Sequence, residues 1–160
     1  MSQSLALARF LPYRCNSLAR KISVSLSRIY AEKYGLSIPQ WRVLVTLAEY
    51  GELQASQVTE LTSLDKVQVS RAVAGLSERG LLRRRSSERD SRAALLCLSD
   101  TGQALFHRIE PEVLAWEQAL LVPLEPAEQE VLFALIDRLE LRLQEMRPVG
   151  DATTGAGRSP

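Results

Sequence analysis

Residues 62–92 constrain this chain more than any other stretch, because they predict a short helix followed by a basic hairpin. Asp65 precedes the helix and Gln68 lies three residues later. This spacing is close to that of the capping box, in which two side chains cap the N-terminus of a helix. Gly80 suits the left-handed conformation that often ends helices. The apolar positions recur at helical spacing and predict a buried face made of Val69, Ala72, Val73 and Leu76.

The other side of this predicted helix is largely polar. It carries Lys66, Val67, Gln68, Ser70, Arg71 and Ala74. Two short apolar and branched runs follow, residues 81–85 and 93–98, and they predict the strands of a hairpin with a charged tip at residues 86–92. We expect the helix to enter a major groove of DNA and the hairpin tip to lie beside it.

Charge is distributed unevenly, although the net charge of the whole chain is only +1. Residues 66–92 contain eight bases and three acids, a net charge of +5. Residues 101–146 contain three bases and nine acids, a net charge of −6. The first block suits a polyanion, and the second would be repelled by one. Two ordinary solvated faces are the alternative, but the link between the bases and a capped helix favours nucleic acid.

Composition indicates one globular domain. At 160 residues and 46% hydrophobic content, the chain is long enough for a core. No run approaches the roughly 20 apolar residues of a membrane span, and the first residues lack a signal-peptide pattern. We therefore expect a cytoplasmic protein that does not contact a membrane. With one histidine, His107, and no phosphate loop or catalytic triad, we expect neither an enzyme nor a metal site or cofactor.

Long amphipathic helices are predicted on both sides of the basic segment. Apolar residues step by three or four along residues 11–29, 105–120 and 132–146. Their stripes exceed what the central segment can cover, so we expect a twofold dimer through the terminal helices, with an intrachain three-helix bundle as the alternative. In a dimer, two reading helices about 34 Å apart can engage two half-sites of a pseudo-palindromic duplex.

Capping and breaking residues set the remaining boundaries. Ser37 is expected to cap a helix that Gly51 closes, and Ser99 a helix at residues 100–121. Residues 54–61 predict a short helix with Val58 and Leu61 inward, after a strand residue at Leu53. The fold class is therefore mainly α with a small β-hairpin wing. We expect an N-terminal dimerisation helix (1–34), a winged helix-turn-helix module (35–98), C-terminal dimerisation helices (99–146) and a disordered tail (147–160).

Five short segments resemble a known family in order and spacing. They are LSIPQWRVL at 36–44, LDKVQVSRAV at 64–73, RGLLRR at 79–84, DSR at 90–92 and LSDTG at 98–102. Over residues 11–146 the chain resembles the MarR-type transcriptional regulators. The resemblance implies a homodimeric repressor of nearby genes that binds double-stranded DNA and is released by a small effector of aromatic or phenolic type.

The resemblance also implies roles for single residues. Ser70 and Arg71 match positions that meet bases and phosphates, and Lys66 can reach a phosphate. Asp90 and Arg92 match a wing-tip pair, in which the acid orients an arginine that enters the minor groove. The full expected DNA-contacting set is Lys66, Val67, Gln68, Ser70, Arg71, Arg84, Arg89, Asp90 and Arg92.

Val67 and Gln68 depart from the family pattern, in which small hydroxyl residues are frequent at these positions. Gln68 can read adenine with both ends of its amide, and Val67 can touch a thymine methyl group. Alternatively, the capping role occupies the Gln68 amide. The base preference stays open between these readings.

Two further expectations concern regulation. The resemblance implies a ligand cleft between the dimer helices and the winged module, to which Tyr13, Arg14, Tyr30 and Trp41 can contribute. Some relatives that sense hydroperoxides use a cysteine near the start of the first helix, so a redox switch through Cys15 is the alternative. Cys15 nevertheless lies on the apolar stripe, where a free cysteine is often a small core residue, and Cys97 on its strand is expected to be core.

Overall fold

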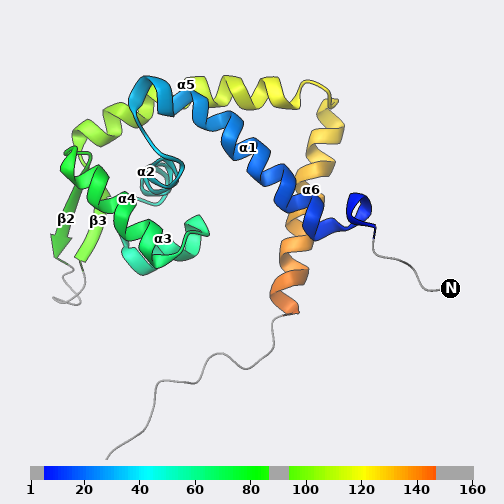
Figure 1. Cartoon of the computed structure of the whole chain (residues 1–160), viewed down its shortest axis with the longest axis horizontal. Coiled ribbons are helices and arrows are strands. Elements are labelled where there is room, and N and C mark those ends of the chain that lie inside the picture. Colours follow the sequence, from blue (N-terminus) through cyan, green and yellow to red (C-terminus); the bar gives the residue numbers. More distant parts are fainter. Residues whose placement is uncertain (1–5, 87–93, 147–160) are drawn as a thin grey trace, which may run out of the picture. The chain divides into compact units, whose positions relative to one another are not determined.

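The computed structural model describes residues 6–86 and 94–146, and it is mainly helical with one small sheet (Figure 1). The elements in chain order are η1 (Leu7–Arg9), α1 (Leu11–Tyr34), α2 (Ile38–Tyr50), β1 (Leu53–Gln54), α3 (Ala55–Thr62), α4 (Lys66–Glu78), β2 (Leu82–Ser86), β3 (Ala94–Leu98), α5 (Asp100–Leu121) and α6 (Pro126–Glu145). The wing tip and the expected disordered tail lie outside the described residues. The chain divides into two compact units, Met1–Trp116 and Glu117–Pro160.

Capping boxes start α2 and α4, where the sequence predicted a cap at Ser37 and a capping-box pattern at Asp65 and Gln68. The Ser37 hydroxyl accepts from the Gln40 backbone N–H at 3.3 Å, and the Gln40 side chain accepts from the Ser37 N–H at 2.9 Å. Asp65 and Gln68 repeat this exchange at 2.7 and 3.2 Å. Each box satisfies two N–H groups that have no partner inside the helix.

The core lies among α2, α3, α4 and the sheet. The predicted inward face of α4 is buried, and so are Trp41 and Leu44 on α2. The two helices pack closely at Gly75 of α4. A Cβ atom added there would lie 2.6 Å from the Gln40 side-chain nitrogen of α2. A methyl group at this position would therefore force the Gln40 amide to move.

The prediction for the inward face of α3 was wrong at Leu61, whose side chain is 47% exposed. Thr62 is buried instead, one full turn after the buried Val58, and its hydroxyl donates to the Val58 carbonyl at 2.6 Å. Residues four apart share one helix face, and this internal hydrogen bond satisfies the threonine hydroxyl inside the core.

The sheet has the strand order β1-β3-β2, with both pairs antiparallel. The hairpin register runs from Leu82 opposite Leu98 to Ser86 opposite Ala94. Leu53 pairs with Leu96, so the predicted third strand is confirmed. β2 therefore begins directly after the turn that ends α4, and β3 pairs with it to complete the wing hairpin.

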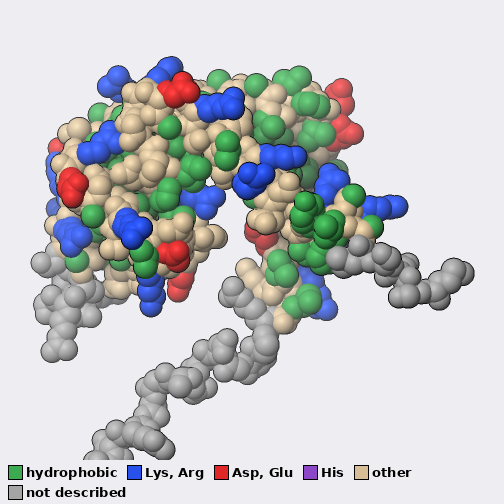
Figure 2. Space-filling view, in the orientation of Figure 1, with side chains coloured by type: hydrophobic (Ala, Val, Ile, Leu, Met, Phe, Trp, Pro, Cys, Tyr) green, Lys and Arg blue, Asp and Glu red, His purple; other side chains and the backbone are tan. Residues whose placement is uncertain are grey.

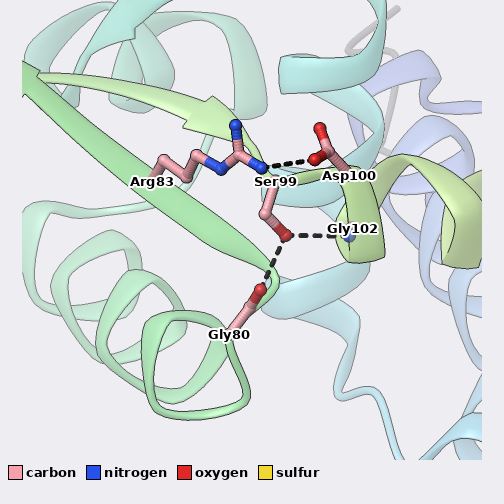
Figure 3. A network of polar contacts seen from close by, with 5 residues as sticks. All are labelled: Gly80, Arg83, Ser99, Asp100 and Gly102. Carbon is pink, nitrogen blue, oxygen red and sulfur yellow. Dashed lines mark hydrogen bonds and ion pairs between the residues drawn. The ribbon is translucent and has the colours of Figure 1, made fainter.

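Ser99 joins that turn to the start of α5 (Figure 3). Its hydroxyl donates to the Gly80 carbonyl at 2.6 Å and accepts from the Gly102 N–H at 3.0 Å, which confirms the predicted cap. Gly80 has a φ of 68°, as expected for the left-handed turn. A Cβ on Gly102 would lie 2.1 Å from the Leu81 carbonyl oxygen, so only glycine fits there.

The terminal helices keep much of their apolar surface exposed. In α1 the seam residues Leu11, Cys15 and Leu18 are exposed, whereas Tyr30 near its end is buried. In the described part of α6 no residue is buried. None of the described helices is long and apolar enough to cross a membrane.

Candidate nucleic-acid interface

The outward face of α4 carries the residues expected to meet DNA. Lys66, Val67, Gln68, Ser70 and Arg71 are all exposed, and Val67 is 59% exposed despite its apolar side chain. Figure 2 shows Lys and Arg side chains spread over the winged module that includes α4 and β2 in Figure 1. An exposed helix of this kind, held from behind by α2 and α3, is free to enter a groove of another molecule.

A groove of about 390 Å³ lies between α3, α4 and the wing strands. It brings together Lys66 and Ser70 from α4 and Arg84 from β2, which the sequence had placed in one interface. The groove also contains Ser56 and Thr59 of α3, which the sequence reasoning missed. The Thr59 hydroxyl donates to the Ala55 carbonyl at 2.9 Å, so the Ser56 hydroxyl beside the two cations is the one that suits an anion such as a DNA phosphate. The signal for these two residues was their position in α3, the first helix of the helix-turn-helix.

The three consecutive arginines of β2 are divided between two faces of the sheet. Arg84 lines the groove beside α4, whereas Arg83 and Arg85 line a different pocket of about 350 Å³ between α2, α5 and the wing strands. There Arg83 pairs with Asp100 at 2.6 Å, and Arg85 pairs with Glu52 at 2.9 Å. Alternate residues of a strand point to opposite faces, so the arginine run directs only its middle member toward the α4 groove.

A third base of the segment also binds within the chain. Arg79 donates to the carbonyls of Tyr34 and Gly35 at 2.8 and 3.2 Å. Arg79, Arg83 and Arg85 thus bind groups of this chain, so the net charge of +5 for residues 66–92 overstates what the module presents to a polyanion. Both exposed arginine–carboxylate pairs are of the kind that contributes little to stability.

Gln68 performs the capping role in this structure. Its side-chain oxygen accepts from the Asp65 N–H at 3.2 Å. Reading adenine with both ends of the amide needs that same oxygen. The cap and the adenine contact therefore compete for one atom of Gln68.

The four residues expected to contribute to a ligand cleft separate into two pairs. Tyr30 and Trp41 lie in the core, with ring centroids 5.0 Å apart, and Trp41 also stacks on Phe106 at 6.3 Å. Burial raises the pKa of Tyr30, and Arg42 opposes this shift. Tyr13 and Arg14 are exposed near the other end of α1, about 25 Å from Tyr30 along a regular helix. One chain does not bring both pairs to one site.

The remaining expected residues are placed as follows. Arg89, Asp90 and Arg92 lie outside the described residues. Cys15 is exposed on α1. Cys97 is only partly buried, and its thiol lies 3.8 Å from the Arg83 carbonyl oxygen. His107 is exposed and contacts Glu110 at 3.4 Å.

Known proteins share both the sequence pattern and the fold. Residues 34–93 match the MarR family. The transcriptional regulator PecS of Dickeya dadantii is 30% identical over 79% of this chain and 77% of its own length. A MarR/EmrR family regulator from Acinetobacter sp. ADP1 superposes with a TM-score of 0.80 at 27% identity, over 89% of this chain and 100% of that one. PcaV of Streptomyces coelicolor, solved in complex with its natural ligand, gives 0.72 at 28%, over 88% and 97%.

A helix-turn-helix with an exposed second helix, followed by a basic hairpin, defines a winged-helix DNA-binding protein. The groove that joins α3, α4 and β2 fits this class. Together with the relatives above, it places the chain in the MarR family of transcriptional regulators.

Proposed function

We propose that this regulator is a homodimeric repressor of nearby genes and that a small ligand releases it from a pseudo-palindromic operator. The observation that carries the DNA-binding part is the shared groove of Lys66, Ser70 and Arg84, beside the exposed Arg71. Lys66 and Arg84 hold phosphates, while Ser70 and Arg71 reach base edges. Arg89, Asp90 and Arg92 act at the wing tip in this proposal.

The homodimer is supported by apolar faces that the chain leaves exposed. Apolar side chains along α6 and at its C-cap are 38–63% exposed, at Leu132, Leu135, Ile136, Leu139, Leu143 and Met146. The first turns of α1 add Leu11 at 52% and Leu18 at 58%. Exposed apolar faces of this extent mark interaction surfaces. A second copy of the chain supplies the same faces in a twofold arrangement.

Release by a ligand follows from geometry. Two recognition helices in a dimer must match successive major grooves, about 34 Å apart. A ligand that binds better to another arrangement of the two modules shifts the population away from the DNA-binding one. The structure of PcaV with its natural ligand shows that a similar protein binds a ligand, and this supports the proposed release by a ligand. We propose a small aromatic or phenolic molecule, for which Tyr13 and Arg14 are the accessible members of the expected set.

Arg71→Ala tests the assignment of α4 as the recognition helix. Its affinity for the DNA upstream of its own gene, measured by fluorescence anisotropy, should fall by roughly 1–3 kcal/mol, about tenfold to hundredfold. Arg83→Ala is the matched control, because Arg83 faces the pocket away from α4 and should leave binding nearly unchanged. Equal affinity of wild type and Arg71→Ala would reject the assignment.

A redox switch through Cys15, a free thiol on α1, is a second candidate for the same regulator. Peroxide should then release wild type from DNA and leave Cys15→Ser bound. If both proteins dissociate equally under peroxide, Cys15 is not the sensor.

A further inference from the structure

Arg79 links the ends of two helices that lie far apart in the sequence. It is the C-cap of α4, and its guanidinium donates to the carbonyls of Tyr34 at 2.8 Å and Gly35 at 3.2 Å. Tyr34 is the last residue of α1, and Gly35 is its C-cap. The last carbonyls of a helix have no N–H partner inside it. Arg79 therefore completes the end of α1 from a different helix.

The charge of Arg79 suits this place as well as its donors do. Both α1 and α4 end here, and a helix C-terminus carries partial negative charge. The guanidinium of Arg79 lies at the end of α1 and offsets the partial charge there, and the residue that carries it is itself the C-cap of α4. Its planar fork can also donate to two carbonyls at once, which the single ammonium of a lysine does less well.

A third helix is tied to the same point. The Tyr34 hydroxyl donates to Glu112 of α5 at 2.9 Å, and Lys33 donates to the other carboxylate oxygen of Glu112 at 2.6 Å. The guanidinium of Arg108, also on α5, lies 5.8 Å from the centre of the Tyr34 ring. Tyr34 therefore joins α5 through its side chain and α4 through its backbone carbonyl.

We infer that Arg79 is a positioning residue for DNA binding: it holds the recognition helix to α1 and α5 and does not contact DNA. This inference rests on the proposed function of α4. The basic segment around Arg79 suggests a phosphate contact instead, but the guanidinium is directed to Tyr34 and Gly35. Because α1 also carries the proposed dimer seam, Arg79 connects the seam to the helix that reads DNA.

Two substitutions separate the charge of Arg79 from its fork. Arg79→Gln removes the charge, and Arg79→Lys keeps the charge but not the fork. We expect DNA affinity to fall roughly fivefold to tenfold in Arg79→Gln and less in Arg79→Lys. The slope of affinity against salt should stay at the wild-type value in both, because no phosphate contact is lost. A phosphate contact would reduce that slope by about one.

A distance measurement separates positioning from a loss of folding. Spin labels at Arg28→Cys on α1 and Ala74→Cys on α4, in a Cys15→Ser/Cys97→Ser background, report the distance between the helices. Arg79→Gln should broaden that distribution while circular dichroism at the same temperature shows a folded chain. An unchanged distribution, a reduced salt slope or wild-type affinity in Arg79→Gln would each overturn the inference. Arg71→Ala is measured alongside. If Arg71→Ala binds DNA normally, the proposed reading role of α4 fails. If Arg71→Ala is defective and Arg79→Gln binds DNA normally, only the proposed role of Arg79 is rejected.

Discussion

Arg83 and Arg84 are adjacent in β2, and their side chains lie in pockets on different sides of the wing strands. Arg83 binds Asp100 at the start of α5, whereas Arg84 shares a groove with Lys66 at the start of α4. The pleat of a strand produces this division without any further signal in the sequence. Two neighbouring residues of one type therefore serve two different parts of the molecule.

This relationship gives opposite expectations for the two arginines. Arg84→Gln should weaken binding to specific and unrelated DNA alike and reduce the salt slope by about one, because a phosphate contact is lost. Arg83→Gln should leave both quantities near wild type. Fluorescence anisotropy over a range of salt concentrations measures both variants. Equal effects of the two substitutions would contradict the division of the strand.

Gly102 should not tolerate a side chain. Gly102→Ala places a methyl group against the Leu81 carbonyl, where the Cβ would lie 2.1 Å from the oxygen. The turn after α4 or the first turn of α5 must shift, so we expect a loss of about 1–3 kcal/mol in the free energy of unfolding. Chemical denaturation measures it. Gln103→Ala, an exposed neighbour, is the control and should change stability by less than about 0.5 kcal/mol; a loss no larger in Gly102→Ala would contradict the packing described.

The contact between α1 and α5 should depend on pH. Hydrogen bonds from Lys33 and then Tyr34 lower the pKa of Glu112 below its ordinary value. A lowered pKa means that the carboxylate stabilises the fold above the ordinary pKa of glutamate and that this contribution is lost as pH falls through the lowered pKa. The hydrogen bond to Glu112 raises the pKa of Lys33, so at the alkaline end the contribution is lost as pH rises through that pKa.

Glu112→Gln tests this dependence. The stability difference between wild type and Glu112→Gln, from denaturation at several pH values, should be small because Lys33 is exposed and Glu112 is only partly buried. It should be largest near neutral pH and disappear in acid. Glu117→Gln, which changes an exposed glutamate of α5, is the control. A difference that is constant across the acid range would show that the ionised form of Glu112 makes no special contribution.

If α6 lies in the interface of the proposed dimer, a single charge introduced on this helix should change the oligomeric state. Leu139→Asp places a carboxylate on a side chain that is 46% exposed in the single chain and buried in the proposed dimer. Burying an unpaired charge is strongly unfavourable, so sedimentation should show a shift toward monomers. Gln144→Asp introduces the same group at a polar position of α6 and is the control. A monomeric wild type would contradict the proposal directly.

Local residues encode most of the element boundaries. Ser37, Asp65 and Ser99 start helices through hydrogen bonds to residues three positions away, and Gly80 ends one through its own φ. Such signals are complete within one turn of chain, which is why the sequence predicts them. The hairpin and the third strand were also predictable, from branched and apolar runs.

The site was harder to predict, because long-range contacts decide the role of each charge. Glu52 is 33 residues from the arginine that it binds, and Tyr34 is 45 residues from Arg79. A count of bases therefore treats paired and available cations alike. The same limit applies to Tyr30 and Trp41, which the family resemblance suggests as ligand contacts and which packing places against each other in the core.

The strand order places β2 at an edge of the sheet in the part of the chain that the structure describes. An edge strand offers a row of backbone N–H and C=O groups to any strand that approaches it, and this invites aggregation. Three consecutive arginines on β2 make such an approach costly, since the same strand of another copy would bring like charges together. The run of arginines on this strand thus also helps to keep copies of the chain from joining sheet to sheet.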